Sequence, residues 1–215
     1  MTISEENYIK TIYHLSLVSP DGVNTNAIAG MLRTKASSVT EMLKKISDKE
    51  LVIYQKYQGV KLTENGLLVA KLIIRKHRLW EVFLLEKLDF TWDEVHDIAE
   101  QLEHIKSEKL IDKLDAFLGF PKEDPHGDPI PNKHGDIMDL DKKLLSEGEL
   151  DKKYICVGVK DTSSDFLQYL DKQKISLGTK LKIIDKESFD NTFEIEIKNK
   201  TIIISSKIAN NLYIK

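Results

Sequence analysis

A long run of helical periodicity follows Thr63 and limits the architectures open to this chain. Its apolar positions recur with helical spacing to about Leu88, and they are Leu67, Leu68, Leu72, Ile73, Trp80, Phe83 and Leu84. Thr63 is suited to cap the start of this helix. The predicted helix is longer than one small domain needs, so we expect it to join two units of the chain.

Two short helices joined by a tight turn are predicted ahead of the long helix. A first helix is expected from an N-cap at Ser4 to about Leu17. Helical spacing then indicates one helix over 25–32, with Ala27, Ile28 and Met31 inward, and another from Ala36 to about Lys49. Alternating runs at 51–54 and 60–62 indicate a two-stranded wing. These elements predict a winged helix-turn-helix, whose second helix would enter the major groove of DNA.

The charge distribution supports this interpretation locally, although the net charge of the whole chain is only −3. Between Arg33 and Lys61, seven basic residues outnumber three acidic ones. A surface that contacts phosphates needs such an excess. The predicted DNA-binding residues are Ser37, Ser38 and Thr40, near bases or phosphates, and Lys35, Lys44 and the wing residue Lys56, on the phosphate backbone.

The second half of the chain changes character from helical to β. A capping box at Thr91 to Glu94 predicts a helix to Leu102, and a further helix is expected to end at Gly119-Phe120-Pro121. From Pro121 to Asp151 the composition indicates a linker. Short β-type runs then follow at 154–159, 180–184, 192–197 and 201–204. The fold class is therefore mainly α with a small β-rich, barrel-like C-terminal domain, and no internal repeat is evident.

Composition excludes several classes of protein. The single cysteine, Cys156, rules out an internal disulfide framework, and its apolar setting favours a buried structural thiol. The chain has no apolar run long enough to span a bilayer and no signal-peptide pattern at its start. We therefore expect a cytoplasmic protein with no membrane partner.

Histidine and acidic side chains cluster between positions 77 and 104. His77 and Glu81 are four residues apart on the long helix, and the next helix places His96, Glu100, Glu103 and His104 on one face. Imidazole and carboxylate groups without a thiolate favour manganese or iron(II). The alternative is a solvated helix face on which these residues are incidental.

These motifs resemble those of the diphtheria toxin repressor-like metalloregulators, especially the manganese-responsive streptococcal-type members. The resemblance covers essentially the whole chain. It rests on the segments Tyr8 to Tyr13, Ser37 to Met42, Arg75 to Leu79, Val95 to Asp97, Leu102 to His104, Leu118 to Pro121 and Pro125 to Gly127.

The resemblance implies a metal-dependent transcriptional repressor with three parts. They are a winged helix-turn-helix domain at 1–70, a helical metal-binding and dimerisation domain at 71–140, and an SH3-like, FeoA-like domain at 150–215. A homodimer loaded with Mn(II) or Fe(II) would bind double-stranded operator DNA and control metal-homeostasis genes. No organic cofactor and no enzymatic activity are expected.

Two metal sites per subunit follow from the family pattern. One would use Asn7, Glu100, Glu103 and His104, and the other His77, Glu81, His96 and His126 with a carboxylate from the C-terminal domain. Asp161 is the first candidate for that carboxylate and Asp165 the second, while His77 suits either site.

This chain departs from the family pattern at three positions. Asn7 stands where relatives have Asp or Met, and Asp124 stands where many have Cys, an exchange that favours hard ions such as manganese. Lys10 replaces a Glu of another manganese-responsive branch, so the paired-metal arrangement of that branch is not expected here.

Two other classes of function remain open from the residues alone. A di-metal carboxylate enzyme also places His and Glu on paired helices, but it would need two facing Glu-x-x-His motifs and would leave the winged helix without a role. A winged-helix regulator that senses an organic ligand would make the His and Glu residues structural. Metal dependence of DNA binding separates these alternatives.

Overall fold

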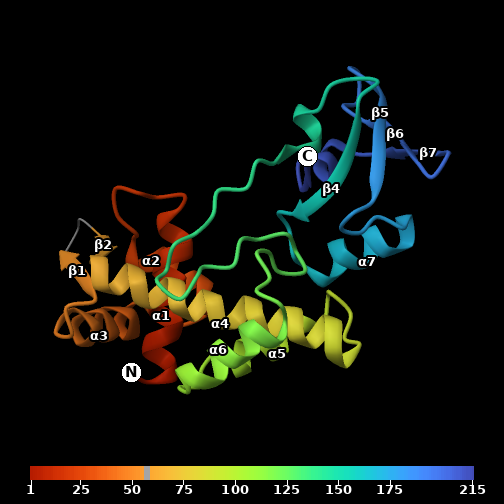
Figure 1. Cartoon of the computed structure of the whole chain (residues 1–215). Coiled ribbons are helices and arrows are strands. Elements are labelled where there is room, and N and C mark those ends of the chain that lie inside the picture. Colours follow the sequence, from red (N-terminus) through yellow and green to blue (C-terminus); the bar gives the residue numbers. More distant parts are fainter. Residues whose placement is uncertain (56–58) are drawn as a thin grey trace. The chain divides into compact units, whose positions relative to one another are not determined.

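The computed structural model describes residues 1–55 and 59–215 (Figure 1). The chain forms two compact units, each assembled from separate stretches of sequence. The N-terminal unit contains residues 1–77, 100–112 and 131–137, and the C-terminal unit contains 78–99, 113–130 and 138–215. Each unit has its own hydrophobic core, so we describe them separately.

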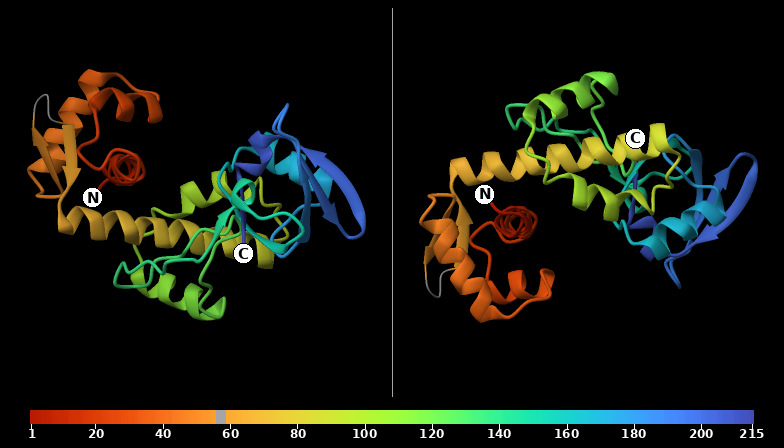
Figure 2. Two further views of the ribbon diagram at one scale, coloured as in Figure 1. Left: turned by 90° about the horizontal axis from the view of Figure 1, so that it is seen from above. Right: turned by 90° about the horizontal axis from the view of Figure 1, so that it is seen from below.

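The N-terminal unit is a winged helix-turn-helix, as predicted. Its elements are α1 (Ile3–Ser16), α2 (Thr25–Met31), α3 (Ala36–Ser47), β1 (Val52–Gln55), β2 (Gly59–Leu62) and the beginning of α4 (Glu64–Leu88). The antiparallel strands β1 and β2 pair Val52 with Leu62 and form the base of the wing. Figure 2 shows these elements gathered around the first turns of α4. The predicted wing contact Lys56 lies outside the described residues.

Local chemistry explains where the first helices begin. The N-cap of α1 is Thr2 and not the predicted Ser4, because the Thr2 side chain and Glu5 form a reciprocal capping box. Asn24 caps α2 through hydrogen bonds from the backbone amides of Asn26 and Ala27. Side-chain capping thus fixes the N-terminal ends of α1 and α2.

The buried faces of α2 and α3 complete the core of the N-terminal unit. In α2 the buried residues are Ile28 and Ala29, whereas Ala27 and Met31, which we expected to be inward, are exposed. In α3, Val39, Leu43 and Ile46 follow helical spacing and are fully buried. The opposite face of α3 is therefore left to solvent.

The start of α4 depends on a glycine. The Thr63 hydroxyl accepts a hydrogen bond from the Gly66 amide at 3.0 Å, which confirms Thr63 as the helix cap. A Cβ at Gly66 would lie 1.9 Å from the Leu51 carbonyl oxygen. Only glycine lets the helix approach the end of α3 and the start of the wing this closely.

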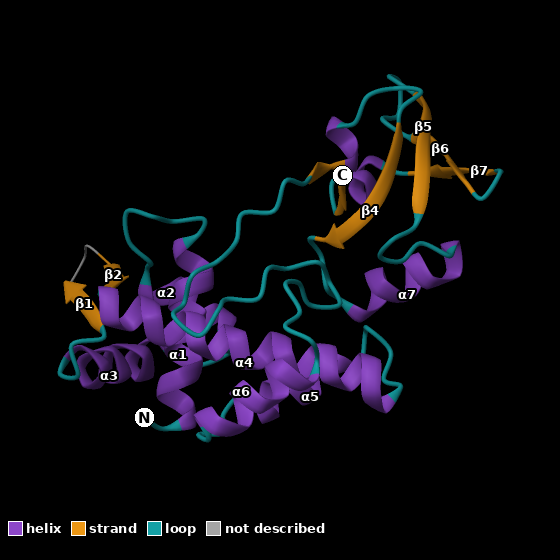
Figure 3. Ribbon diagram, viewed as in Figure 1, coloured by secondary structure: helices purple, strands orange, loops and turns teal. Residues whose placement is uncertain are grey.

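The C-terminal unit is built on a six-stranded antiparallel sheet (Figure 3). Its strands are β3 (Lys143–Leu144), β4 (Lys153–Val159), β5 (Lys180–Lys186), β6 (Phe193–Ile197), β7 (Lys200–Ile204) and β8 (Leu212–Ile214), in the order β3-β8-β4-β5-β6-β7. The short helices η1 (Leu145–Glu147) and α8 (Ser206–Ala209) accompany it. The predicted small β-rich C-terminal domain is confirmed.

The longest helix of the β-rich domain was not predicted, and neither were the short η1 and α8. α7 (Ser164–Gln173) buries Phe166, Leu167 and Leu170 in the core of the sheet domain. Trp92 belongs to the same core, and its indole nitrogen donates to Asp171 on α7 at 3.2 Å. Cys156 is buried there as expected, and burial raises the pKa of its thiol to about 11.

The remaining helices, α5 (Val95–Leu102) and α6 (Glu108–Phe117), each contribute residues to both units. The capping interaction ahead of α5 is present, because the Thr91 amide donates to the Glu94 carboxylate at 2.9 Å. Among the described residues, no helix combines the length and hydropathy needed to cross a membrane.

Candidate metal centres

A tight loop at 124–128 places His126 in the C-terminal unit. The Asp124 Oδ1 atom accepts hydrogen bonds from the backbone amides of His126 at 2.8 Å and Asp128 at 3.0 Å. The His126 carbonyl accepts from the Val159 amide of β4 at 2.8 Å. Gly127 has φ +81°, and a Cβ there would lie 2.0 Å from the Val157 carbonyl oxygen. The loop is therefore held both internally and against β4.

A second loop, at 132–136 in the N-terminal unit, has the same hydrogen bonds from backbone amides to a side-chain oxygen. The Asn132 Oδ1 atom accepts from the amides of His134 at 2.8 Å and Asp136 at 3.0 Å, and Gly135 has φ +80°. The sequences, Asp-Pro-His-Gly-Asp and Asn-Lys-His-Gly-Asp, agree at the last three positions. This short duplication was not recognised as a repeat. His134 is exposed, whereas its counterpart His126 is buried.

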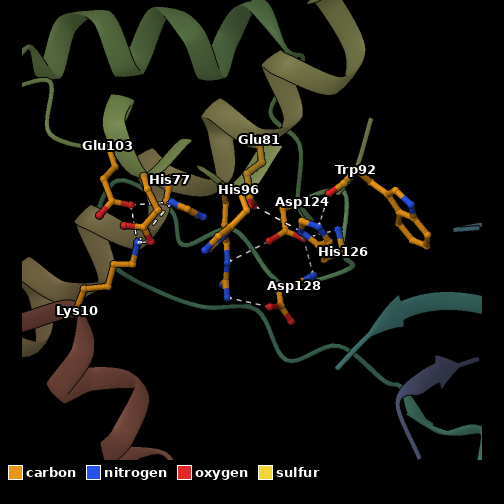
Figure 4. Close-up of polar contacts among 11 residues, drawn as sticks. Lys10, His77, Glu81, Trp92, His96, Glu103, Asp124, His126 and Asp128 are labelled. Carbon is orange, nitrogen blue, oxygen red and sulfur yellow. Dashed lines mark hydrogen bonds and ion pairs between the residues drawn. The ribbon is translucent and has the colours of Figure 1, made fainter. Parts of the chain in front are cut away.

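Glu81, Asp124 and His126 form a buried cluster (Figure 4). Their exposed fractions are 2%, 5% and 3%, and one potential ligand atom from each lies within 4.8 Å of the others. His126 Nδ1 is 3.8 Å from Glu81 Oε2 and 4.0 Å from Asp124 Oδ1. His96 Nδ1 is 3.4 Å from the other Glu81 oxygen, and its side chain is half exposed. We call Glu81, Asp124 and His126, together with His96 on the far oxygen of Glu81, the His126 cluster.

The tautomer of His126 follows from its second contact. His126 Nε2 lies 3.0 Å from the Trp92 carbonyl oxygen, which can only accept a hydrogen bond. Nε2 therefore carries a proton, so Nδ1 is the nitrogen that has the lone pair whenever the ring is neutral, and it is directed toward the two carboxylates. This is the arrangement by which backbone carbonyls orient metal-binding histidines.

The electrostatics of the His126 cluster favour a bound cation. Burial, together with the neighbouring Glu81 carboxylate, raises the pKa of Asp124 to about 7, although Arg78 opposes this shift from 3.3 Å. Burial lowers the pKa of His126, but the hydrogen bond and charge of Glu81 outweigh it and the net direction is upward. A divalent ion would relieve the repulsion between Glu81 and Asp124.

A second cluster, which we call the Glu103 cluster, lies in the N-terminal unit (Figure 4). Lys10 Nζ is 2.5 Å from Glu100 Oε1 and 2.6 Å from Glu103 Oε2. His77 Nδ1 lies 2.7 Å from the same Glu103 oxygen and 3.5 Å from Lys10 Nζ. Burial would raise the pKa of Glu103, but the His77 hydrogen bond and the Lys10 charge outweigh it and lower the pKa. The Lys10 ammonium thus lies among the three side chains that could otherwise hold an ion.

The other oxygen of Glu103 provides the test of fit for a metal. Glu103 is completely buried, and Oε1 has no hydrogen-bond partner. Its neighbour is His104 Nε2 at 3.9 Å. A buried acceptor without a donor is costly, and a cation between Glu103 and His104 would satisfy it. The residues present therefore fit a divalent ion at this position.

The predicted ligands Asn7 and Asp161 are placed differently. Asn7 Oδ1 is also buried without a hydrogen-bond partner, and the side chain borders a pocket of about 410 Å³ that Ser38 on α3 also lines. Asp161 accepts a hydrogen bond from the Ser163 amide at 2.9 Å. Within the described parts of the chain, Asp161 joins no carboxylate and imidazole group of the kind described above, and the reserve candidate Asp165 lies in the first turn of α7.

The predicted DNA contacts share the solvent-facing side of the second helix of the motif. Ser37, Ser38 and Lys44 of α3 are exposed, as is its N-cap residue Lys35. Thr40 is partly buried, and its hydroxyl donates to the Ala36 carbonyl at 3.1 Å. The face opposite the buried Val39, Leu43 and Ile46 is thus polar and basic.

Comparison with known proteins assigns each part of the chain. Residues 1–60 match the iron dependent repressor N-terminal DNA binding domain, residues 63–132 the iron dependent repressor metal binding and dimerisation domain, and residues 143–215 the FeoA domain.

Among similar proteins, the transcriptional regulator MntR of Bacillus velezensis is 30% identical over 149 residues, which are 69% of this chain and 99% of that protein. A solved manganese-dependent transcriptional repressor in complex with manganese superposes with a TM-score of 0.84 at 32% identity, covering 98% of both chains. The manganese regulator SloR gives a TM-score of 0.75 at 33% identity over 100% of this chain and 99% of that one. The chain therefore belongs to the diphtheria toxin repressor-like family of metal-dependent transcriptional repressors, which includes manganese-responsive members.

Proposed function

We propose that the chain acts as a homodimer that represses metal-homeostasis genes by binding double-stranded operator DNA when loaded with Mn(II) or Fe(II). The observation that carries this proposal is the buried, unpartnered Glu103 Oε1, 3.9 Å from His104 Nε2 in the unit that contains the winged helix. A buried carboxylate oxygen without a hydrogen-bond partner is suited to bind a metal ion reversibly. In the same unit, α3 supplies a basic, polar face for DNA.

Two ion positions per subunit account best for the residues. The first is the His126 cluster, where Glu81, Asp124 and His126 would bind the ion with support from His96. The second lies between Glu103 and His104, with Asn7 as a further oxygen ligand. Oxygen and imidazole nitrogen donors without sulfur favour manganese or iron(II) over softer ions.

Lys10 limits how many ions the Glu103 cluster can hold. Its ammonium is within 3.5 Å of Glu100, Glu103 and His77, so it supplies the positive charge there. A metal ion bound to these three side chains would have to displace it against like-charge repulsion. The proposed ion is therefore bound on the other side of Glu103, through Oε1.

The metal would act by shifting a conformational equilibrium. An ion can favour the DNA-binding state only by its differential affinity for the two states. A coupling of about 1 to 3 kcal/mol would tighten operator binding roughly 5- to 150-fold, and operator DNA would raise metal affinity by the same factor.

A mobility-shift titration tests the proposal directly. We expect operator DNA to be bound in excess Mn(II) and released by a chelator. Light scattering on the same sample should give about twice the 24.7 kDa chain mass, because two-fold dimers match palindromic operators. Binding that is unaffected by the chelator would contradict metal control and favour a regulator of another kind. A monomer that binds a single half-site would contradict the dimer.

Phosphate contacts by α3 predict a specific salt dependence. Lys35→Ala and Lys44→Ala should each weaken binding to all DNA sequences and lower the slope of log affinity against log salt by roughly one unit, because one phosphate contact is lost. Lys198→Ala, which removes an exposed lysine of the C-terminal unit, serves as the control for net charge. An unchanged slope in both α3 variants would remove this helix from the DNA interface.

A further inference from the structure

α1 contributes a carboxylate that the family pattern does not include. Glu6 Oε2 lies 2.6 Å from His104 Nδ1, and both side chains are about nine-tenths buried. The adjacent Asn7, which the resemblance singles out as a ligand, makes no such contact in the described structure. Glu6 therefore has a defined partner at the proposed ion position.

The direction of this hydrogen bond decides which nitrogen of His104 can bind a metal. The Glu6 carboxylate can only accept, so the proton between them belongs to His104 Nδ1. The lone pair of the neutral ring is then on Nε2. Nε2 faces Glu103 Oε1, the buried oxygen without a hydrogen-bond partner, at 3.9 Å.

We infer that Glu6 is the positioning residue of this site: it fixes the tautomer and ring orientation of His104, so that Nε2 and Glu103 Oε1 bind one divalent ion together. This inference rests on the proposed role of His104 as a metal ligand. Carboxylates that accept the second N–H of a metal-binding histidine also raise its basicity, and their loss typically weakens metal binding roughly 10- to 100-fold.

The position of Glu6 on α1 extends its role to the DNA-binding domain. Glu6 follows the capping box of Thr2 and Glu5, and the adjacent turn carries Tyr8, Ile9 and Ile12 into the core of the winged helix. The hydrogen bond therefore joins the proposed metal position to a helix whose apolar side chains lie in the core of the winged helix-turn-helix. A change in His104 on metal binding would be transmitted to α1 through Glu6.

The test compares two neighbouring glutamates of nearly equal burial. Glu6→Gln keeps the size of the side chain and an oxygen acceptor but removes the charge. Glu5→Gln is the control, because Glu5 is 6% exposed against 8% for Glu6, and its carboxylate pairs instead with Lys49 at 2.7 Å. Manganese binding is measured by calorimetry on the full-length protein, together with the thermal stability of the metal-free protein.

We expect Glu6→Gln to weaken Mn(II) binding at one of the sites roughly 10- to 100-fold with little change in metal-free stability, while Glu5→Gln binds Mn(II) as the parent does. Nitrogen-15 NMR of the diamagnetic Zn(II)-loaded parent should show His104 protonated at Nδ1 and bound to zinc through Nε2. Coordination through Nδ1, or a Glu6→Gln affinity within twofold of the parent, would overturn the inference. Loss of all metal binding in the parent would instead contradict the proposed function itself.

Discussion

Replacing Glu103 with alanine is expected to abolish the activation of operator binding by manganese. The variant loses the buried Oε1 that would bind the ion opposite His104, and with it the roughly 5- to 150-fold gain in DNA affinity that metal would supply. The fold should survive, because Lys10 keeps Glu100 as a partner. Operator affinity in saturating Mn(II) should therefore equal the metal-free affinity of the parent.

The measurement is a manganese titration of the parent and the variant, each with and without operator DNA. In the parent, DNA should raise metal affinity by the factor by which metal raises DNA affinity. Glu103→Gln retains the shape of the side chain if the alanine variant proves unstable, and Glu86→Ala removes an exposed charge from α4 as a control. A Glu103 variant that still responds to manganese would show that this carboxylate is not part of the switch.

Gly127→Ala is expected to destroy the His126 cluster and to destabilise the C-terminal unit. The added Cβ would lie 2.0 Å from the Val157 carbonyl oxygen, and the residue must keep φ +81°. The backbone of either the 124–128 loop or β4 has to move, so we expect the free energy of unfolding to fall by at least about 2 kcal/mol. The displaced His126 would then no longer face Glu81 and Asp124, and metal binding there should be lost.

The second loop supplies a matched control for this substitution. Gly135 has φ +80° and the same hydrogen-bonded turn, but the atom that its added Cβ would clash with is the end of the Leu68 side chain at 2.8 Å, and Lys71 at 3.6 Å is at ordinary contact distance. Gly135→Ala should therefore cost only about 1 kcal/mol for the backbone conformation. Thermal unfolding and Mn(II) calorimetry of both variants give the comparison, and equal losses in the two would show that the packing against β4 is unimportant.

The winged helix-turn-helix and α4 could be predicted because their periodicity is strong and their caps and turns are local features. α3 begins at Ala36 and α4 is capped by Thr63, both as expected. Elements decided by tertiary packing were harder to predict. α7 has a short amphipathic pattern in a stretch dominated by β-type runs, and β3 has only two residues, which depend on β8 for their hydrogen bonds.

In the candidate site, too, local periodicity could be predicted from the sequence, whereas tertiary contacts could not. The spacing of His77, Glu81, Glu100 and Glu103 identified the side chains that cluster, because helical periodicity fixes which residues share a face. It could not decide between neighbours such as Glu6 and Asn7, whose directions on α1 differ by about 100° in an ideal helix. The structure gives Glu6 the contact with His104. The role of Lys10 as a charge within the Glu103 cluster likewise depends on a contact 93 residues away in sequence.

The Lys10 ammonium differs from a metal ion in one further respect, which is that it cannot diffuse away. Because it is covalently attached to α1, its effective concentration at Glu100 and Glu103 does not change when the cell is starved of metal. The first helix is thus tethered to Glu100 and Glu103 before any ion arrives, and metal binding would act on it only through the separate contact between Glu6 and His104. The Glu103 cluster then binds a single dissociable ion. Its saturation with free metal should therefore follow a simple one-site binding curve.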